Sequence, residues 1–304
     1  MKGYLHPEYV SSLAEFGDPY TLPLSGGWLL KRHIPGLGNS DLMGPYPLFF
    51  CHNWQKLHLD IDSIEANLIS LALVTDPFGA YDEPYLQRCF KDVILPFKSH
   101  FIIKLNASKF HHVSKHHRYY AKKALKNVTI TILQSPIQSS LDGWLRLYTV
   151  LKKRHRLHGI KAFSKDSFSQ QLSIPGVIMF QACYQDELIG AHLWFQHEEV
   201  AYSHLAAYSP LGYEMMASYA LHWQAIDYFA DKVRWLDLGA GAGICRKTST
   251  TDGLNFFKQG WSTETRIAYF CGRIFNPIKY YELVQACGNR STSYFPAYRA
   301  GEFV

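Results

Sequence analysis

The chain has 304 residues, of which 47% are hydrophobic and 15% aromatic. That apolar content is ample for a packed core, so we expect a globular protein of one large or two ordinary domains. The formal net charge of +6 is mild. It favours anionic partners such as phosphates, nucleotides or RNA, and it is equally common in ordinary enzymes.

Neither a membrane span nor a signal peptide is indicated. Residues 1–10 contain no apolar segment, and all apolar runs are far shorter than the roughly 18 residues that a span requires. The six cysteines lie far apart with no CxxC pair. This pattern favours reduced thiols in a cytoplasm over a disulfide framework or a zinc site. We therefore expect a cytoplasmic protein without a membrane span.

The first part of the chain alternates strand and helix patterns. Apolar and β-branched runs predict strands, and helical spacing predicts helices between them. The strands are expected at residues 27–33, 68–75, 100–105 and 128–133, and the helices at 83–93 and 114–126.

A polar stretch, residues 134–141, contains Pro136 and three serines. We interpret it as a domain boundary, which gives domains of residues 1–135 and 136–304.

The second domain is expected to contain a β-meander followed by a crossover. Short polar turns separate the first three strands and imply antiparallel hairpins. A strand, a long helix and a further strand then imply a parallel pair. The expected order is helices at 141–157 and 165–172, strands at 177–184, 188–196 and 200–208, a helix at 213–229, a strand at 233–238, a helix at 253–258 and a strand at 265–272.

The two halves also show a weak internal repeat. Pro77 with Gly79 matches Pro210 with Gly212, and Leu105 matches Leu238, both at an offset of 133 positions (210 − 77 and 238 − 105). A shared offset predicts a duplicated unit of about that length.

Residues 233–262 organise the second domain. An apolar strand pattern leads into Gly239, Gly241 and Gly243, where we predict a turn beside the active-site cleft. Such a motif is also typical of S-adenosylmethionine methyltransferases. Their first strand, however, must be followed by several further βα units. Residues 244–304 are too few to supply them, so the methyltransferase interpretation is disfavoured.

The order of elements in the second half resembles the GNAT fold of N-acetyltransferases, and two such units in tandem resemble the FemABX-like aminoacyltransferases. In the first half, the basic helix 114–126 leading into a strand looks like a segment of this family. In the second half, Asp237-Leu238-Gly239, Asp252-Gly253-Leu254 and Phe257-Lys258-Gln259-Gly260-Trp261 look like its strand, glycine and phenylalanine-lysine segments. The resemblance implies an α/β (α+β) fold of two tandem GNAT-like units, each a mixed, mostly antiparallel sheet flanked by helices.

The resemblance also implies an activity, acyl transfer to an amine. The co-substrate would be acyl-CoA or aminoacyl-tRNA, with no permanently bound cofactor. The acceptor would be a small-molecule, glycan or peptide amine such as a cell-wall or polysaccharide precursor, with tRNA a further partner if it is the donor. Residues 209–214 depart from the coenzyme A loop of acetyltransferases because they supply one glycine and an acid, which leaves aminoacyl-tRNA open as the donor.

Three residues are candidates for catalysis. Lys258 lies where the resemblance places a substrate-contacting lysine, although a lysine at a helix end can also simply extend to solvent. His204 could serve as a base or be a core histidine. Asp237, at a strand end, could be a base or could bond the turn glycines.

Further residues are candidates for substrate or co-substrate binding. Lys115, Arg118 and Lys122 recur at helical spacing and form one basic stripe, which is either a solvated face or an anion site. The remaining binding candidates lie at the start of the crossover helix and around the lysine: Gly212, Tyr213, Phe257 and Trp261.

Two other classes of function need separate consideration. His112 and His116 are spaced like metal ligands on a helix, yet no carboxylate or cysteine completes a set, so no metal site is predicted. A duplicated unit that holds a nucleotide or peptide without catalysis is the main alternative to an enzyme. Consumption of an acyl donor in the presence of an amine would separate the two.

Overall fold

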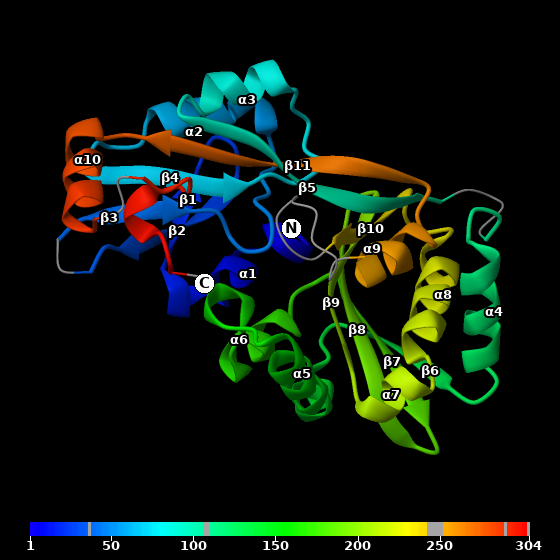
Figure 1. Ribbon diagram of the computed structural model, residues 1–304. Coiled ribbons are helices and arrows are strands. Elements are labelled where there is room, and N and C mark those ends of the chain that lie inside the picture. The colour runs from blue at the N-terminus through cyan, green and yellow to red at the C-terminus, as the bar shows by residue number, and fades with distance from the viewer. Residues whose placement is uncertain (36–37, 106–109, 242–251, 289–290, 303–304) are drawn as a thin grey trace. The chain divides into compact units, whose positions relative to one another are not determined.

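The computed structural model describes residues 1–35, 38–105, 110–241, 252–288 and 291–302 (Figure 1). The chain divides into two compact units. The larger unit comprises residues 1–6, 98–157 and 164–266, and the smaller unit comprises residues 7–97, 158–163 and 267–304. Both units therefore draw on both sides of the predicted boundary at residue 136, and the predicted 133-residue duplication stays a prediction.

The smaller unit is a mixed sheet with short helices. Its strand order is β1-β2-β3-β4-β11, in which β3 and β4 are parallel and the other neighbouring pairs are antiparallel. The strands are β1 (Asp18–Leu22), β2 (Gly27–His33), β3 (Ser40–Met43), β4 (Leu68–Val74) and β11 (Glu264–Ile274), and the helices are α1 (Pro7–Ser11), α2 (Leu57–Asp62), α3 (Glu83–Cys89) and α10 (Pro277–Ala286).

The larger unit has the strand order β5-β10-β9-β8-β7-β6, with β9 and β10 parallel and the other neighbours antiparallel. Its strands are β5 (Val93–Lys104), β6 (Thr129–Gln134), β7 (Val177–Tyr184), β8 (Glu187–His197), β9 (Val200–Tyr208) and β10 (Trp235–Ala240). Its helices are α4 (Lys115–Ala124), α5 (Leu141–His155), α6 (Lys165–Gln171), α7 (Pro210–Glu214), α8 (Ala217–Phe229) and α9 (Asp252–Gln259). Strands β5 and β11 each contribute residues to both units.

Helices cover both faces of the larger unit's sheet: α8 and α4 lie on one side, and α5 and α6 on the other (Figure 1). The alternation of a β-strand sends successive side chains to these two layers. On β8, for example, Trp194 packs with Phe229 of α8. Its neighbour Phe195 packs with Tyr4 and His204. The two faces of one strand thus serve two separate cores.

The predicted element order of the second half is confirmed, from the two helices through the meander to the last strand. One predicted helix, residues 213–229, is interrupted. The chain forms α7, passes through Met216 with a left-handed φ of 57°, and only then begins α8. Ser209 caps α7 through a hydrogen bond from the Gly212 amide, and Pro210 occupies its first position. These capping residues start a helix earlier than hydrophobic periodicity alone indicates.

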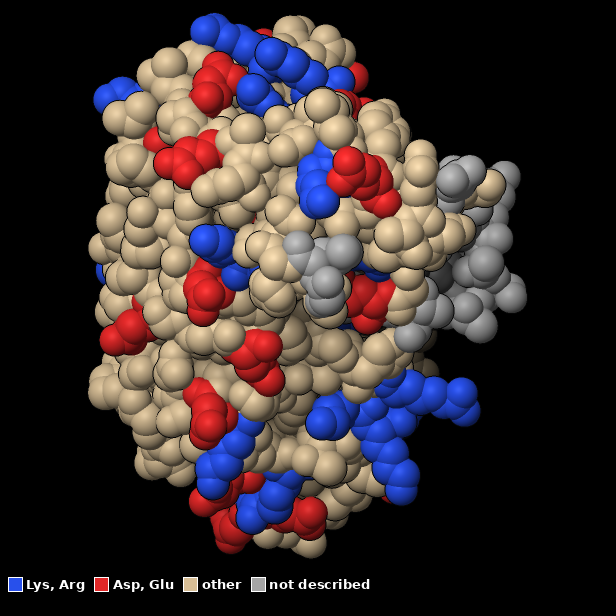
Figure 2. Space-filling view, turned by 90° about the vertical axis from the view of Figure 1, so that its left-hand side faces the viewer, with Lys and Arg blue, Asp and Glu red and all other residues tan. Residues whose placement is uncertain are grey.

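On the face drawn in Figure 2, basic and acidic side chains are interspersed, and Lys and Arg gather along the top edge and at the lower right. Within the described ranges, none of the helices is long and apolar enough to cross a membrane.

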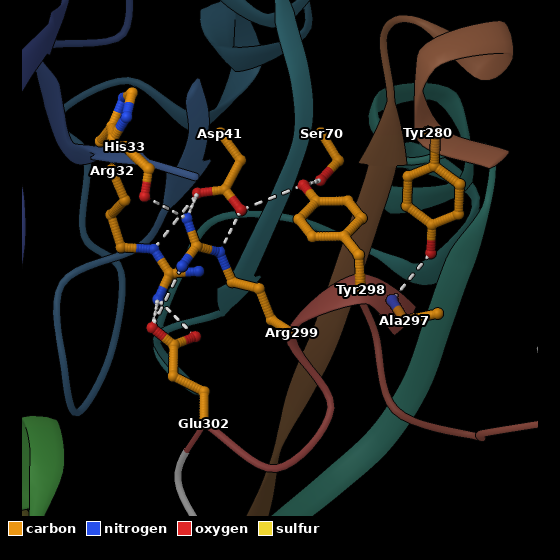
Figure 3. Close-up of polar contacts among 9 residues, drawn as sticks. All are labelled: Arg32, His33, Asp41, Ser70, Tyr280, Ala297, Tyr298, Arg299 and Glu302. Carbon is orange, nitrogen blue, oxygen red and sulfur yellow. Dashed lines mark hydrogen bonds and ion pairs between the residues drawn. The ribbon is translucent and has the colours of Figure 1, made fainter. Parts of the chain in front are cut away.

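A buried ionic network ties the end of the smaller unit's chain to its sheet (Figure 3). The Asp41 carboxylate, fully buried on β3, accepts hydrogen bonds from Arg299 at 2.5 and 3.0 Å and from Arg32 at 3.3 Å. Tyr298 donates to the same carboxylate at 3.0 Å. Glu302 accepts from both arginines. The buried charges are therefore paired and hydrogen-bonded on several sides.

Removing one arginine from this network should destabilise the smaller unit. Arg299→Met leaves the buried Asp41 with fewer partners, and we expect a loss of roughly 3 kcal/mol in the free energy of unfolding, measured by urea denaturation. Lys279→Met is the matched control, because it breaks an exposed ion pair with Glu282 and should cost less than about 1 kcal/mol. Equal effects of the two substitutions would contradict the stabilising role of the network.

Candidate functional site

Two neighbouring strands of the larger unit separate partway along their length. Strand β10 pairs with β9 in parallel from Trp235 opposite Val200 to Asp237 opposite Tyr202. Beyond that point β9 continues along β8 as far as Tyr208, and β10 continues beside β5 to Ala240. Backbone groups on the facing edges beyond the separation point are therefore not used in a ladder between β9 and β10.

Both strands are irregular just beyond the separation point. In β9 the register moves from Trp194 opposite Ser203 to Leu193 opposite Leu205, so His204 is an extra residue of a bulge. In β10 the register shifts between Asp237 and Ala240, where Gly239 has a φ of 73°. A side chain at Gly239 would be strained. Both bulges therefore lie where the two strands separate.

Lys258 of α9 reaches this place. Its Nζ donates a hydrogen bond to the Ala240 carbonyl at 2.6 Å, and it lies 3.3 Å from where a Cβ at Gly239 would be. The side chain is partly exposed along its length, but its ammonium is desolvated. This burial lowers the pKa of Lys258 to about 8, opposed by the charge of Asp237 and reinforced by that of Lys98. Lys258 thus holds a cation, easily deprotonated, beside the separated strands.

Asp237 is held by hydrogen bonds at the base of the separation. His100 Nδ1 donates to its two oxygens at 3.0 and 2.8 Å, and the Gly239 amide donates to Oδ1 at 2.7 Å. The carboxylate is 1% exposed. This arrangement favours the interpretation of Asp237 as the residue that fixes the β10 bulge and contributes negative charge near Lys258.

The sequence did not indicate two buried histidines on the α8 side of the sheet. His192 of β8 and His222 of α8 have ring centroids 4.8 Å apart, and the charge of Lys258 contributes to lowering the pKa of both. Burial lowers the pKa of His192 well below its usual range and that of His222 to about 4. The only sequence signal was a histidine within each of two otherwise apolar segments, which is weak because core histidines have the same pattern.

Aromatic residues surround the lysine segment. The His222 ring stacks on Trp261 at 5.6 Å and meets Phe257 edge-on at 4.9 Å. Both predicted aromatic residues therefore pack against His222 and help to desolvate the adjoining Lys258. His117 of α4 holds α9 in place, since its Nε2 donates to the Phe257 carbonyl at 2.9 Å.

The structure does not bring His204 to this site. It faces the α6 side of the sheet, where its Nδ1 pairs with the Tyr4 hydroxyl at 2.9 Å and its Nε2 donates to Gln171 Oε1 at 3.1 Å. Burial lowers the pKa of His204 to about 3. The prediction that His204 is a catalytic base is at odds with this geometry, because both ring nitrogens are engaged in a separate core.

Gly212 and Tyr213 lie in α7. A Cβ at Gly212 would lie 2.0 Å from the Ile189 carbonyl oxygen, so the residue permits close packing of α7 on β8. Its amide is already bonded to Ser209. Tyr213 is partly exposed, and the guanidinium of Arg154 lies over its ring at 4.1 Å.

The basic stripe lies on α4. Lys115 and Lys122 are exposed and Arg118 is half-buried. In the described part of the chain no ion pair involves these three residues. Helix α4 packs against α8, and its His117 donates to the Phe257 carbonyl of α9, the helix that carries Lys258. Whether the stripe binds an anion stays a prediction.

The glycine motif does not belong to a methyltransferase sheet. Strand β10 lies between antiparallel β5 and parallel β9 in a mostly antiparallel sheet, whereas the methyltransferase motif requires a doubly wound parallel sheet. Gly239 and Gly241 are described, and Gly243 lies outside the described residues. Over the described ranges, no group of three or more His, Cys, Asp or Glu side chains is arranged to hold a metal ion.

Comparisons with known proteins are consistent with this geometry. Residues 111–244 match the family model of the acetyltransferase (GNAT) domain. Among solved structures, FemX has a TM-score of 0.63 at 14% identity, over 84% of this chain and 86% of that chain. The C-terminal domain of a putative lysylphosphatidylglycerol synthetase from Agrobacterium fabrum has a TM-score of 0.60 at 12% identity, over 91% and 90%. The L-PGS structure from Bacillus licheniformis scores 0.59 at 12% identity, over 90% and 93%.

At these identities the structural likeness concerns the fold, and it confirms the predicted mixed α/β class. The chain has no match among the curated proteins compared with it.

The lowered pKa of Lys258 makes a prediction about stability. At pH values between the folded pKa of about 8 and the usual pKa of 10.5, the lysine holds its proton in the unfolded chain and has lost it in the folded chain. Stability therefore rises with pH across this window. We expect the wild type to gain stability relative to Lys258→Met as the pH rises through it, measured by urea unfolding at several pH values. A stability difference between wild type and Lys258→Met that does not change with pH would contradict the conclusion that the ammonium is desolvated.

The close packing of Gly260 on the His117 ring leads to a second prediction. A Cβ there would lie 2.1 to 2.5 Å from atoms of the His117 ring. Gly260→Ala should displace the ring and cost roughly 1–3 kcal/mol. Gly253→Ala in α9, the helix that ends just before Gly260, is the control, since nothing lies within 4 Å of a Cβ there, and it should be neutral or slightly stabilising. Thermal unfolding that ranks the two variants in the opposite order would refute this packing argument.

Proposed function

We infer that this chain, an acyltransferase with a GNAT domain at residues 111–244 and the fold of FemX, transfers an acyl group from acyl-CoA or aminoacyl-tRNA to an amine. We propose both the donor and the acceptor of this reaction.

The separation of β9 from β10 after Tyr202 and Asp237 carries the proposal. An acyl donor that lies between the two strands can hydrogen-bond through its carbonyl to backbone N–H groups freed from the ladder. These N–H groups are aligned before the reaction, so they stabilise the developing oxyanion at little reorganisation cost. The bulge of β9, between Ser203 and Leu205, lies just beyond the last residue of β9 that pairs with β10.

Lys258 supplies the positive charge of the site. Its ammonium is desolvated and bonded to the Ala240 carbonyl, where a charge acts more strongly than it would in water. We propose that it stabilises the oxyanion or binds an anionic group of a substrate. Asp237 keeps the lysine charged at neutral pH, because its negative charge raises the pKa of Lys258.

The reaction needs no covalent enzyme intermediate. The amine attacks the activated carbonyl directly, so the protein has to align two substrates and manage one proton. A thioester and an aminoacyl ester present the same carbonyl to the strands. Lysylphosphatidylglycerol synthetase, the name of one structurally similar protein, refers to transfer of a lysyl group, which makes an aminoacyl donor worth testing here.

The test is donor consumption in the presence of amines. The protein is incubated with a panel of acyl-CoA species and charged tRNAs, with peptidyl, amino-sugar and small amines as acceptors, and products are identified by mass spectrometry. We expect one donor class to be consumed with formation of an amide. No donor loss with any combination would contradict acyl transfer and favour a protein that only binds a nucleotide or peptide.

Lys258→Met tests the residue within that assay. The substitution keeps the length and apolar stem but removes the charge, so we expect a loss on the order of 10²-fold in kcat. The melting temperature should change little, because loss of the bond to the Ala240 carbonyl is offset by removal of a desolvated ammonium. Lys165→Met on α6 removes an exposed lysine and should leave kcat unchanged. A Lys258→Met variant that is folded and fully active would exclude the lysine from the reaction.

A further inference from the structure

We propose that His222 is the proton acceptor for the attacking amine, and that His192 connects it to the bulge of β9. This proposal rests on the proposed acyl transfer. It concerns two residues that no sequence pattern singled out, and it gives the reaction a base in place of His204.

The hydrogen bonds of His222 fix its tautomer. Its Nδ1 lies 2.8 Å from the Ser218 carbonyl oxygen. A carbonyl can only accept, so Nδ1 carries the hydrogen and Nε2 carries the lone pair. No hydrogen bond to Nε2 is found among the described residues. The imidazole is therefore held with a basic nitrogen available, which is the state that a general base requires.

His192 extends this arrangement to the separated strand. Its Nε2 lies 2.8 Å from the Ser203 hydroxyl, next to the extra residue of the β9 bulge. Its Nδ1 is buried and has no hydrogen-bond partner within the described residues. A buried polar atom without a partner is costly. A bound substrate group or water at this nitrogen would remove that cost.

The unpartnered atom is one of a group. Ring contacts run from Trp194 to His192 at 4.7 Å, to His222 at 4.8 Å and to Trp261 at 5.6 Å. Both tryptophan Nε1 atoms are also buried without partners in the described part of the chain. Together with His222 Nε2, each of the four side chains in this row thus has a polar atom without a hydrogen-bond partner among the described residues.

The charges around His222 favour its neutral form. The titratable groups that face it are His192 from β8, His117 from α4 and Lys258 from α9. Burial is the largest cause of its lowered pKa, and Lys258 and His117 lower it further. The positive charge of Lys258 disfavours protonation of His222 in the resting protein. Protonation becomes more favourable when negative charge develops on the reacting groups.

The alternative bases are already occupied. The Asp237 carboxylate accepts from His100 and from the Gly239 amide. His204 lies in the other core with both nitrogens engaged. His222 differs from both because its basic nitrogen is unused.

The proposed step balances as follows. The amine nitrogen forms a bond to the acyl carbon, the bond from that carbon to the donor's sulfur or oxygen breaks, and His222 Nε2 takes one proton from the nitrogen. The imidazolium then gives that proton to the departing thiolate or alkoxide, which restores the neutral ring. No other reactant is needed.

Two substitutions of His222 test the step in the full chain. His222→Asn can keep a donor for the Ser218 carbonyl but lacks the basic nitrogen. We expect kcat to fall by about 10²–10⁴-fold with little change in KM. The kcat of His222→Ala should fall by a similar factor. Added imidazoles should restore activity, at a rate that depends on the pKa of the added base. Dependence of rescue on basicity separates proton transfer from a merely structural role.

Phe168→Leu on α6 is the control, because it alters a fully buried ring in the separate core on the other face of the sheet. It should lower the melting temperature while kcat of the folded protein stays close to that of the wild type. An active wild type with a fully active His222→Asn variant, or rescue that is independent of base strength, would overturn the proposal. A wild type that transfers no acyl group to any amine would instead refute the proposed function itself.

A measurement on the wild type covers the case in which neither variant folds. Nitrogen-15 NMR of labelled histidines at neutral pH should show His222 as the neutral form with hydrogen on Nδ1. An imidazolium, or a hydrogen on Nε2, would contradict the proposal.

Discussion

The parting of β9 and β10 is the constraint on which the rest of the site depends. Parallel neighbours normally continue their ladder, because unpaired backbone groups inside a protein are costly. Here pairing stops at Tyr202 and Asp237, and each strand contains a bulge just beyond that point. The bulge of β10 is held by the bond from the Gly239 amide to Asp237 and by Lys258 on the Ala240 carbonyl. Residues that look catalytic in the sequence therefore also shape the backbone.

Burial on the α8 side then sets the chemical character of the site. The aromatic rings of Phe257 and Trp261 exclude water from His222, and the same low-polarity surroundings lower the pKa of Lys258. Lys258 is charged while His222 is neutral, because protonating both would place two positive charges in one desolvated region. The site is thus prepared to stabilise negative charge at one residue and accept a proton at another.

Much of this fold could be predicted from the sequence, because hairpin turns and hydrophobic periods report on local structure. The meander from residue 177 and the strand that ends at Asp237 follow directly from such patterns. Tertiary partners are less accessible. His204 and His192 both sit in apolar strands, and only the bulge and the alternation of side chains show that they enter different cores. His222 lies on a helix whose period does not reveal the tautomer that Ser218 imposes.

A structure of the protein with a non-reactive analogue of its acyl donor, in which a methylene group replaces the sulfur or oxygen next to the carbonyl, tests the central claim most directly. The account predicts that the carbonyl oxygen lies between β9 and β10 beyond Tyr202 and Asp237, within hydrogen-bonding distance of backbone N–H groups, with Lys258 close by. A donor bound elsewhere, with the two strands unoccupied where they separate, would contradict it.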